Sequence, residues 1–244
     1  MTVEQRAKEI AEFLNIDYTS AFNRLSAGFH HNHHLVTEDF VSNGVDQNNS
    51  ESLLNWYRNT DAYIWELSAY HLDAGFNYSG MCEGIATHLK NTGRKSVLCL
   101  GDGIGDLSLR IAEEGIETTY NDLEGSKTAG YAQYRFSNSG KKIETLYTSS
   151  FEPTLGSRAF DAVVALDFFE HVVNVEEWVD AVFKCLKKGG TFLAQNAFGI
   201  GDVEHGGSMP MHLSINNRFE FEWNSTLEAA GFELHVESGW HIKP

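Results

Sequence analysis

Basic residues are scarce in this sequence of 244 residues. Lys and Arg together number 18 against 34 Asp and Glu, which gives a formal net charge of −16. A protein that grips a polyphosphate backbone normally presents a basic face, so this balance argues against a nucleic-acid partner. A small-molecule substrate is the partner that the composition favours.

Cysteine and long apolar runs are scarce as well. The three cysteines lie in apolar patterns and lack the spacing of a metal or redox motif: Cys82, Cys99 and Cys185. Such thiols are typical of reduced, buried cysteines in a cytosolic protein. No apolar run approaches the ~20 residues of a membrane span, and the N-terminus has a polar helix pattern unlike a signal peptide. We therefore expect a soluble, cytoplasmic protein without a membrane partner, whose oligomeric state the sequence leaves open.

The most informative stretch is a strand pattern followed by regularly spaced glycines. Val97–Leu100 is an apolar run of the length of one buried strand. Glycine then recurs at alternate positions: Gly101, Gly103 and Gly105. A helical pattern follows, then a second strand at 116–120, and Asp122 comes about twenty residues after the first glycine. This order is the nucleotide-binding half of a doubly wound α/β sheet.

Each part of this unit has a chemical use. Glycines without a Cβ allow a sharp turn and let a ligand lie against backbone amides. The N-terminus of the next helix adds partial positive charge, which suits a carboxylate or phosphate. A carboxylate at the tip of the second strand can accept both hydroxyls of a ribose, and we assign this role to Asp122. A dinucleotide site would need a third glycine where this chain has Asp106, so the turn does not suit NAD.

The form G-x-G-x-G after a strand resembles motif I of the class I S-adenosylmethionine-dependent methyltransferases. The resemblance runs over roughly residues 95–198 and includes Asp122, the segment A-F-D-A-V-V-A-L-D-F-F-E-H-V at 159–172 and L-K-K-G-G-T-F-L-A-Q-N at 186–196. It implies a Rossmann-like, doubly wound seven-stranded sheet, S-adenosylmethionine as cofactor, and methyl transfer. An intact glycine turn with Asp122 argues against a non-catalytic binding module, the third function class that we weigh.

The resemblance also implies where the cofactor is held. The family usually has an acid at the position of Cys99, so Asp102 or Asp106 is expected to take over the contact to the methionine amino group. Ser150 stands where the family usually has an acid beside the adenine. The cofactor-binding residues expected in this way are Gly101, Asp102, Gly103, Gly105, Asp122, Ser150, Phe151 and Asp167.

A second cluster follows the fourth expected strand, 160–166. Glu170 and His171 can act as a general base, or the same pair can simply begin a helix and hydrogen-bond within the fold. The form acid-x-x-E-H, with His205, His212 and F-E-F-E-W at 219–223 further on, resembles metal-dependent class I methyltransferases. Those include the small-RNA 3′-end 2′-O-methyltransferases and the ubiquinone-pathway O-methyltransferases. The ligands of Mg²⁺, Mn²⁺ or Fe²⁺ carried over from them would be Asp167, Glu170, His171 and His212.

Two functions therefore stand ahead of the binding module. The favoured one is a methyltransferase for a small molecule, and the alternative is a metal-dependent 2′-O-methyltransferase of RNA ends. We divide the chain into a helical extension at 1–92 and a cofactor-binding domain at 93–244, and the resemblance implies that the extension forms a lid.

The remaining patterns predict individual elements. Thr2 caps a first helix, and one long aromatic helix is expected at 51–72. The run F-H-H-N-H-H-L at 29–35 is interpreted as a polar loop, although His30 and His34 could share a helix face and hold a metal. Asn224 is expected to cap the last helix. Only 240–244 remain for a seventh strand, so either that strand is very short or the chain is truncated.

Overall fold

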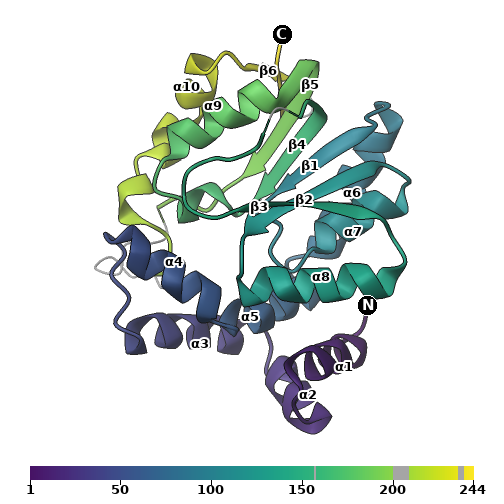
Figure 1. The fold of residues 1–244 in the computed structure, drawn as a ribbon, viewed down its shortest axis with the longest axis vertical. Coiled ribbons are helices and arrows are strands. Elements are labelled where there is room, and N and C mark those ends of the chain that lie inside the picture. The colour runs from purple at the N-terminus through teal and green to yellow at the C-terminus, as the bar shows by residue number, and fades with distance from the viewer. Residues whose placement is uncertain (157, 200–208, 236–238) are drawn as a thin grey trace.

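A seven-stranded sheet forms the centre of the computed structural model, which describes residues 1–156, 158–199, 209–235 and 239–244 (Figure 1). The strand order is β3-β2-β1-β4-β5-β7-β6; β1 to β5 pair in parallel, and β7 runs antiparallel to both of its neighbours. The predicted doubly wound α/β fold is confirmed. The strands are β1 (Ser96–Leu100), β2 (Glu117–Leu123), β3 (Ile143–Thr148), β4 (Phe160–Leu166), β5 (Leu186–Gln195), β6 (Glu233–His235) and β7 (Trp240–Ile242).

Helices cover both faces of the sheet. Successive side chains of a strand point to opposite faces, and here both faces are buried. Leu98 of β1 packs in the cluster that includes α9 and α10, whereas its neighbour Cys99 packs in the cluster that includes α6 and α7. The helices are α1 (Val3–Leu14), α2 (Tyr18–Ser26), α3 (Phe29–Ser42), α4 (Ser50–Asn59), α5 (Ala62–Leu72), α6 (Tyr78–Asn91), α7 (Asp106–Glu113), α8 (Lys127–Ser139), α9 (Val175–Cys185) and α10 (Phe219–Ala229).

The first five helices gather at one end of the sheet (Figure 1). α1 begins as predicted at Thr2, whose hydroxyl accepts from the Gln5 amide while the Gln5 side chain accepts from the Thr2 amide. α3 and α5 pack against each other, and α5 also contacts α6 and α8. None of the described helices is both long enough and apolar enough to cross a membrane.

The single helix predicted at 51–72 is wrong, because the structure divides it into α4 and α5. Thr60 has an extended backbone, with φ −72° and ψ 142°, which ends α4. Its hydroxyl donates to Asp39 at 2.8 Å and accepts from the Ala62 amide at 3.1 Å, so it satisfies a free amide at the start of α5. The two aromatic segments therefore lie on separate helices.

The histidine run is helical rather than the predicted loop. It forms the first turns of α3, and the Asn32 side chain bonds back to the carbonyls of Arg24 and Gly28. Val36 and Phe40 then bury the inner face of the helix. Among the described residues, neither His30 nor His34 belongs to a cluster that could hold a metal ion.

Two C-terminal predictions also need correction or completion. Asn224 does not cap a helix, since α10 already begins at Phe219 and Asn224 lies within it. β5 begins at Leu186, which pairs with Phe160 of β4 before a register shift brings Thr191 opposite Ala162. The very short seventh strand is confirmed as Trp240–Ile242, and β6 pairs with it at Glu233–His235.

Candidate functional site

A cavity of about 440 Å³ opens where the five parallel strands end. Its volume is in the range of small-molecule sites, and this edge is where open α/β sheets bind ligands. Residues at the carboxyl ends of all five parallel strands line it, and α3, α4, α5 and α6 supply the opposite wall. The strand-end residues are Leu100, Asp122, Thr148, Leu166 and Gln195.

The glycine turn forms one side of the cavity. Gly101 and Gly103 line it with φ values of 66° and 52°, a region that favours glycine. A Cβ at Gly101 would lie 2.2 Å from the Phe168 ring. Gly105, at φ 79°, is not among the lining residues; its missing Cβ allows α7 to approach Phe136 of α8. Two of the three predicted glycines are therefore placed to touch a ligand.

Asp122 lies beside this turn as predicted. Its Oδ2 accepts from the Gly103 amide at 2.8 Å and its Oδ1 from the Leu123 amide at 2.7 Å. Burial raises the pKa of the carboxyl to about 6, although both amide bonds lower it. The group is ionised at neutral pH, and each oxygen keeps lone-pair capacity for a ribose hydroxyl.

Ser150 and Phe151, the residues expected beside the adenine, both line the cavity after β3. The Ser150 hydroxyl accepts from the Glu152 amide at 3.1 Å. The Phe151 carbonyl accepts from the indole of Trp178 at 2.8 Å, which fixes the segment over α9. The cavity wall therefore continues from Asp122 to these two residues.

The two acids within the glycine turn, Asp102 and Asp106, differ in position and in hydrogen-bond partners. Asp102 lines the cavity, and its carboxylate accepts from the Ser108 amide at 2.7 Å and the Leu107 amide at 3.3 Å. It thus caps α7, and burial raises its pKa to about 7. Asp106 is not a lining residue; two arginines and a histidine bind it.

Aromatic side chains form the other end of the cavity. Tyr57 of α4 and Tyr63 of α5 stack with ring centroids 5.8 Å apart, and Tyr70 lies two turns further along α5. The sequence analysis predicted an aromatic helix here but did not single out Glu66. That acid is 5% exposed, lines the cavity and lies 3.1 Å from the His33 imidazole. Its spacing of three from Tyr63 and four from Tyr70, which places all three on one helix face, was the available signal.

Three predicted metal ligands come together at this end. Glu170, His171 and His212 each offer an atom, and these atoms all lie within 4.8 Å of one another. Glu170 and His171 belong to the short helix η1 (Phe169–His171), and His212 precedes η3 (Ser214–Asn216). The Leu213 amide donates to the Glu170 carbonyl at 2.9 Å, so the two segments are directly joined.

Hydrogen bonds fix how these three side chains face each other. Nδ1 of His171 lies 3.2 Å from the Met211 carbonyl, and Nδ1 of His212 lies 3.0 Å from the Ala197 carbonyl. A carbonyl only accepts, so these contacts are satisfied when both Nδ1 atoms carry the proton and both Nε2 atoms keep a lone pair; the Tyr57 hydroxyl, 3.1 Å from Nδ1 of His171, can then accept as well. Burial lowers the pKa of His171 to about 3 and that of His212 to about 4. Both imidazoles are therefore neutral.

Glu170 completes this group with a free oxygen. Its Oε1 accepts from the Ala197 amide at 2.7 Å, whereas its buried Oε2 has no hydrogen-bond partner. Burial, then the nearby Asp167, raises the pKa of Glu170 to about 8. A buried acceptor without a partner is costly unless something fills the site.

Asp167, the fourth predicted ligand, is not in this group. It follows β4 with φ 50°, an uncommon backbone conformation for a residue other than glycine, and it lines the cavity. Burial, then Glu66, raises its pKa to about 6. His205 lies outside the described residues. The F-E-F-E-W segment is part of α10, and none of its residues lines the cavity.

Comparisons with known proteins agree with this arrangement. Residues 98–192 match a family model described as a methyltransferase domain. The chain is 28% identical over 108 residues to the ubiquinone biosynthesis O-methyltransferase of Rickettsia canadensis, covering 44% of this chain and 45% of that protein. It is 35% identical over 97 residues to the protein of the same name from Azoarcus, covering 39% and 41%. The matches thus span about half the length of these relatives or less.

The fold has counterparts among solved structures. A phosphoethanolamine N-methyltransferase of Haemonchus contortus, solved with S-adenosyl-L-methionine, superposes with a TM-score of 0.56 at 17% identity, covering 74% of this chain and 44% of that one. At this identity the likeness concerns the fold alone.

Proposed function

We propose that the chain is a class I S-adenosylmethionine-dependent methyltransferase that transfers a methyl group from S-adenosylmethionine to a small-molecule acceptor, a proposal that the match of residues 98–192 to a methyltransferase domain supports. The observation that carries the proposal is the continuity of one cavity. It runs from the glycine turn and Asp122 to an aromatic end covered by α3, α4 and α5. One wall can hold the cofactor, and the other can hold an acceptor beside it.

The lining of the cavity supports a small acceptor rather than a nucleic acid. Among the described residues no lysine or arginine lines it, whereas four carboxylates do: Glu66, Asp102, Asp122 and Asp167. A phosphate backbone would need cationic contacts here. A cavity rich in tyrosine and phenylalanine instead suits a compact, apolar or aromatic molecule without negative charge.

The reaction itself would rest mainly on positioning. Methyl transfer from a sulfonium is an in-line displacement, so holding donor and acceptor in a dry cavity supplies much of the rate. Carboxylates near the sulfonium also match its positive charge. Where the acceptor is a hydroxyl or a protonated amine, Glu170 or His171 lies at the strand end from which a base could take its proton.

Labelled methyl transfer tests this function. Purified protein would be supplied with S-adenosylmethionine carrying a labelled methyl group and, separately, with a low-molecular-mass cell extract and with an RNA fraction. The proposal expects label in the small-molecule fraction, absent when Asp122→Ala protein is used. Label in RNA alone would favour the RNA-end alternative, and no transfer to either fraction would contradict a methyltransferase.

A second candidate, metal-assisted O-methylation, is favoured by Glu170, His171 and His212. Two bare Nε2 atoms and one unpartnered carboxylate oxygen within 4.8 Å fit a divalent ion such as Mg²⁺, Mn²⁺ or Fe²⁺. The Met211 and Ala197 carbonyls hold the two imidazoles in the ligating tautomer. An ion bound there would act as a Lewis acid that makes an acceptor hydroxyl more acidic.

Metal binding can be measured apart from cofactor binding. Titration of metal-free protein with Mn²⁺ should show one site, and His212→Ala should lose it while it still binds S-adenosylmethionine. His34→Ala is the matched control, because His34 lies on the outer part of α3 beside Glu38. Absence of a Mn²⁺ site, together with full activity in chelator, would remove this candidate and leave Glu170 and His171 as bases or structural residues.

A further inference from the structure

The glycine turn leaves a gap in the expected cofactor contacts. The family position for an acid is held by Cys99, which is fully buried. Of the two acids expected to replace it, only Asp102 lines the cavity. Asp102 caps α7 through the amides of Leu107 and Ser108, and Asp106 is turned away from the cavity. Asp102 therefore already binds two amides of the helix, and a further side chain at this end of the cavity can share the contact to the amino-acid end of the cofactor.

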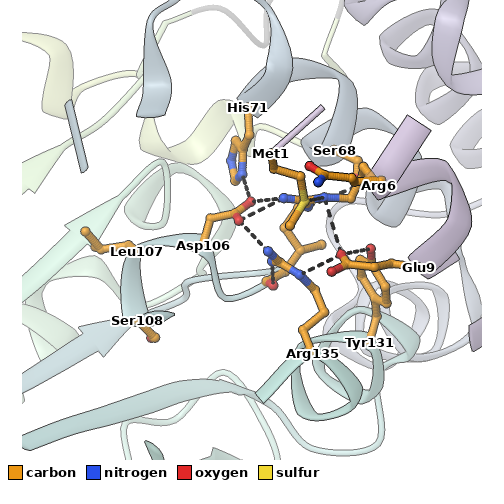
Figure 2. Close-up of polar contacts among 12 residues, drawn as sticks. Met1, Arg6, Glu9, Ser68, His71, Asp106, Leu107, Ser108, Tyr131 and Arg135 are labelled. Carbon is orange, nitrogen blue, oxygen red and sulfur yellow. Dashed lines mark hydrogen bonds and ion pairs between the residues drawn. The ribbon is translucent and has the colours of Figure 1, made fainter. Parts of the chain in front are cut away.

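Asp106 instead forms the centre of a polar cluster built by four elements (Figure 2). Arg6 of α1, itself 2% exposed, donates to both of its oxygens at 2.8 and 3.0 Å. Arg135 of α8 donates at 2.6 Å. His71 of α5 approaches through Nδ1, at 2.6 Å. The two arginines hold the pKa of Asp106 well below its usual range despite its burial.

This cluster fixes the protonation of His71. An ionised carboxylate only accepts, so Nδ1 of His71 must carry the proton and Nε2 must keep its lone pair. Burial lowers the pKa of the imidazole, with Arg6 and Arg135 adding to that effect against Asp106, so the ring is neutral. His71 therefore offers one hydrogen-bond acceptor on the edge away from Asp106.

That edge faces the cavity. His71 lines the cavity and Asp106 does not, so the ring separates the two. The ring also stacks on Tyr78 of α6, another lining residue, with centroids 3.6 Å apart and planes 2° from parallel. Asp106 below it and Tyr78 beside it leave the imidazole one orientation.

The position along the cavity matches the amino-acid arm of the cofactor. Asp122 marks the ribose, Ser150 and Phe151 mark the adenine, and the reacting methyl must face the aromatic end. The remaining arm must then pass along the glycine turn toward the start of α7. His71 lies there, one turn of α5 after Leu67, which covers Gly103.

We propose that His71 binds the α-amino-acid end of S-adenosylmethionine, with Nε2 accepting a hydrogen bond from the α-ammonium group. Arg6 is a positioning residue, which acts through Asp106 and brings the N-terminal helix into the cofactor site from a hundred residues away. Arg135 ties the same cluster to the turn by donating to the Ile104 carbonyl. The inference rests on the proposed use of S-adenosylmethionine.

Two cofactor fragments separate this role from a structural one. S-adenosylhomocysteine carries the amino-acid arm, and 5′-methylthioadenosine has the same nucleoside and thioether without it. In calorimetric titrations, His71→Leu should bind S-adenosylhomocysteine about tenfold or more weakly, with 5′-methylthioadenosine within about twofold of wild type. His71→Asn, which can keep a donor toward Asp106 but loses the cavity-facing nitrogen, should show the same selective loss.

Variants of Arg6 form the second part of the experiment. Arg6→Met should lose S-adenosylhomocysteine affinity selectively but less than His71→Leu, and Arg6→Lys should recover part of it. Lys8→Met, an exposed change on the same helix, should match wild type.

Equal losses for both ligands, or no loss for S-adenosylhomocysteine, in the two His71 variants would overturn the proposal while leaving the cofactor assignment in place. Failure of wild-type protein to bind either ligand would overturn the cofactor assignment and the role of His71 together.

Discussion

The Asp122 carboxylate binds the backbone of the glycine turn and is also placed to bind a ligand. Its carboxylate closes the glycine turn through the Gly103 amide and also faces the cavity. Burial raises its pKa to about 6, so a modest drop in pH changes its charge. The neutral carboxyl is a weaker acceptor for ribose hydroxyls than the carboxylate.

We therefore expect S-adenosylmethionine affinity to fall as pH decreases through about 6. Folding responds in the opposite direction at this residue, because a raised folded-state pKa favours the native state as the group takes up its proton. Loss of affinity at pH 5 would thus not reflect unfolding through Asp122. Titrations from pH 5 to 8 would measure the effect, and Asp122→Asn should flatten this part of the profile at a lower overall affinity. An unchanged profile in that variant would assign the effect to another group.

At the residue scale the sequence predicted some roles and missed others. Asp122, Ser150, Phe151, Glu170, His171 and His212 were placed by local motifs, and the structure puts each beside the cavity or in the three-residue cluster. Asp102 and Asp106 could not be told apart. Asp102 lines the cavity and Asp106 does not. This difference depends on Arg6 and Arg135, which are distant in sequence and bind Asp106 rather than Asp102.

At the scale of elements, the glycine turn depends on both backbone conformation and close packing. Gly101 and Gly115 have similar φ values, 66° and 78°. A Cβ at Gly101 would collide with Phe168, whereas one at Gly115 would meet nothing within 4 Å. The pair therefore separates the strain of positive φ from the effect of filling the cavity wall.

Gly101→Ala should abolish or strongly weaken S-adenosylmethionine binding, because the ring of Phe168, which also lines the cavity, must shift. Gly115→Ala should keep wild-type affinity and lose only about 1 kcal/mol of stability from backbone strain. Calorimetry and urea unfolding measure the two effects. Equal affinity of both variants would show that the wall at Gly101 does not touch the cofactor.

The break between α4 and α5 is a second testable element. Thr60 caps α5 and bonds Asp39 of α3, so Thr60→Ala should destabilise the protein by about 0.5–2 kcal/mol. Urea unfolding would measure it, with the exposed Thr154→Ala as control. A destabilisation no larger than that of the control would show that the cap contributes nothing.

Elements with a strong local pattern were predictable. The apolar run of β4 was predicted with the bounds that the structure has, and α1 was marked by its cap. The Thr60 break and the histidine run were not, because each depends on a contact with another helix: Thr60 with Asp39 of α3, and Asn32 with the end of α2. A local sequence pattern does not show which distant residue a side chain will contact.

At the scale of the molecule, charge is distributed unevenly. Arg6 and Arg135 are buried and bind Asp106, so two of the 18 basic residues add no positive charge to the surface. We predict that the protein does not bind single-stranded RNA at about 0.15 M salt, where a surface rich in acids repels phosphates. Fluorescence anisotropy with a labelled oligonucleotide would measure this. Binding that weakens steeply with added salt would instead support the RNA-end alternative.

The central claim is that the glycine turn and Asp122 hold S-adenosylmethionine, and a calorimetric titration of wild-type and Asp122→Ala protein tests it most directly. We predict a single site in the wild type and a loss of about 1.5–3 kcal/mol in the variant, since charge-assisted bonds to the ribose are removed. Wild-type protein that binds no S-adenosylmethionine, or a folded Asp122→Ala variant with unchanged affinity, would contradict the claim.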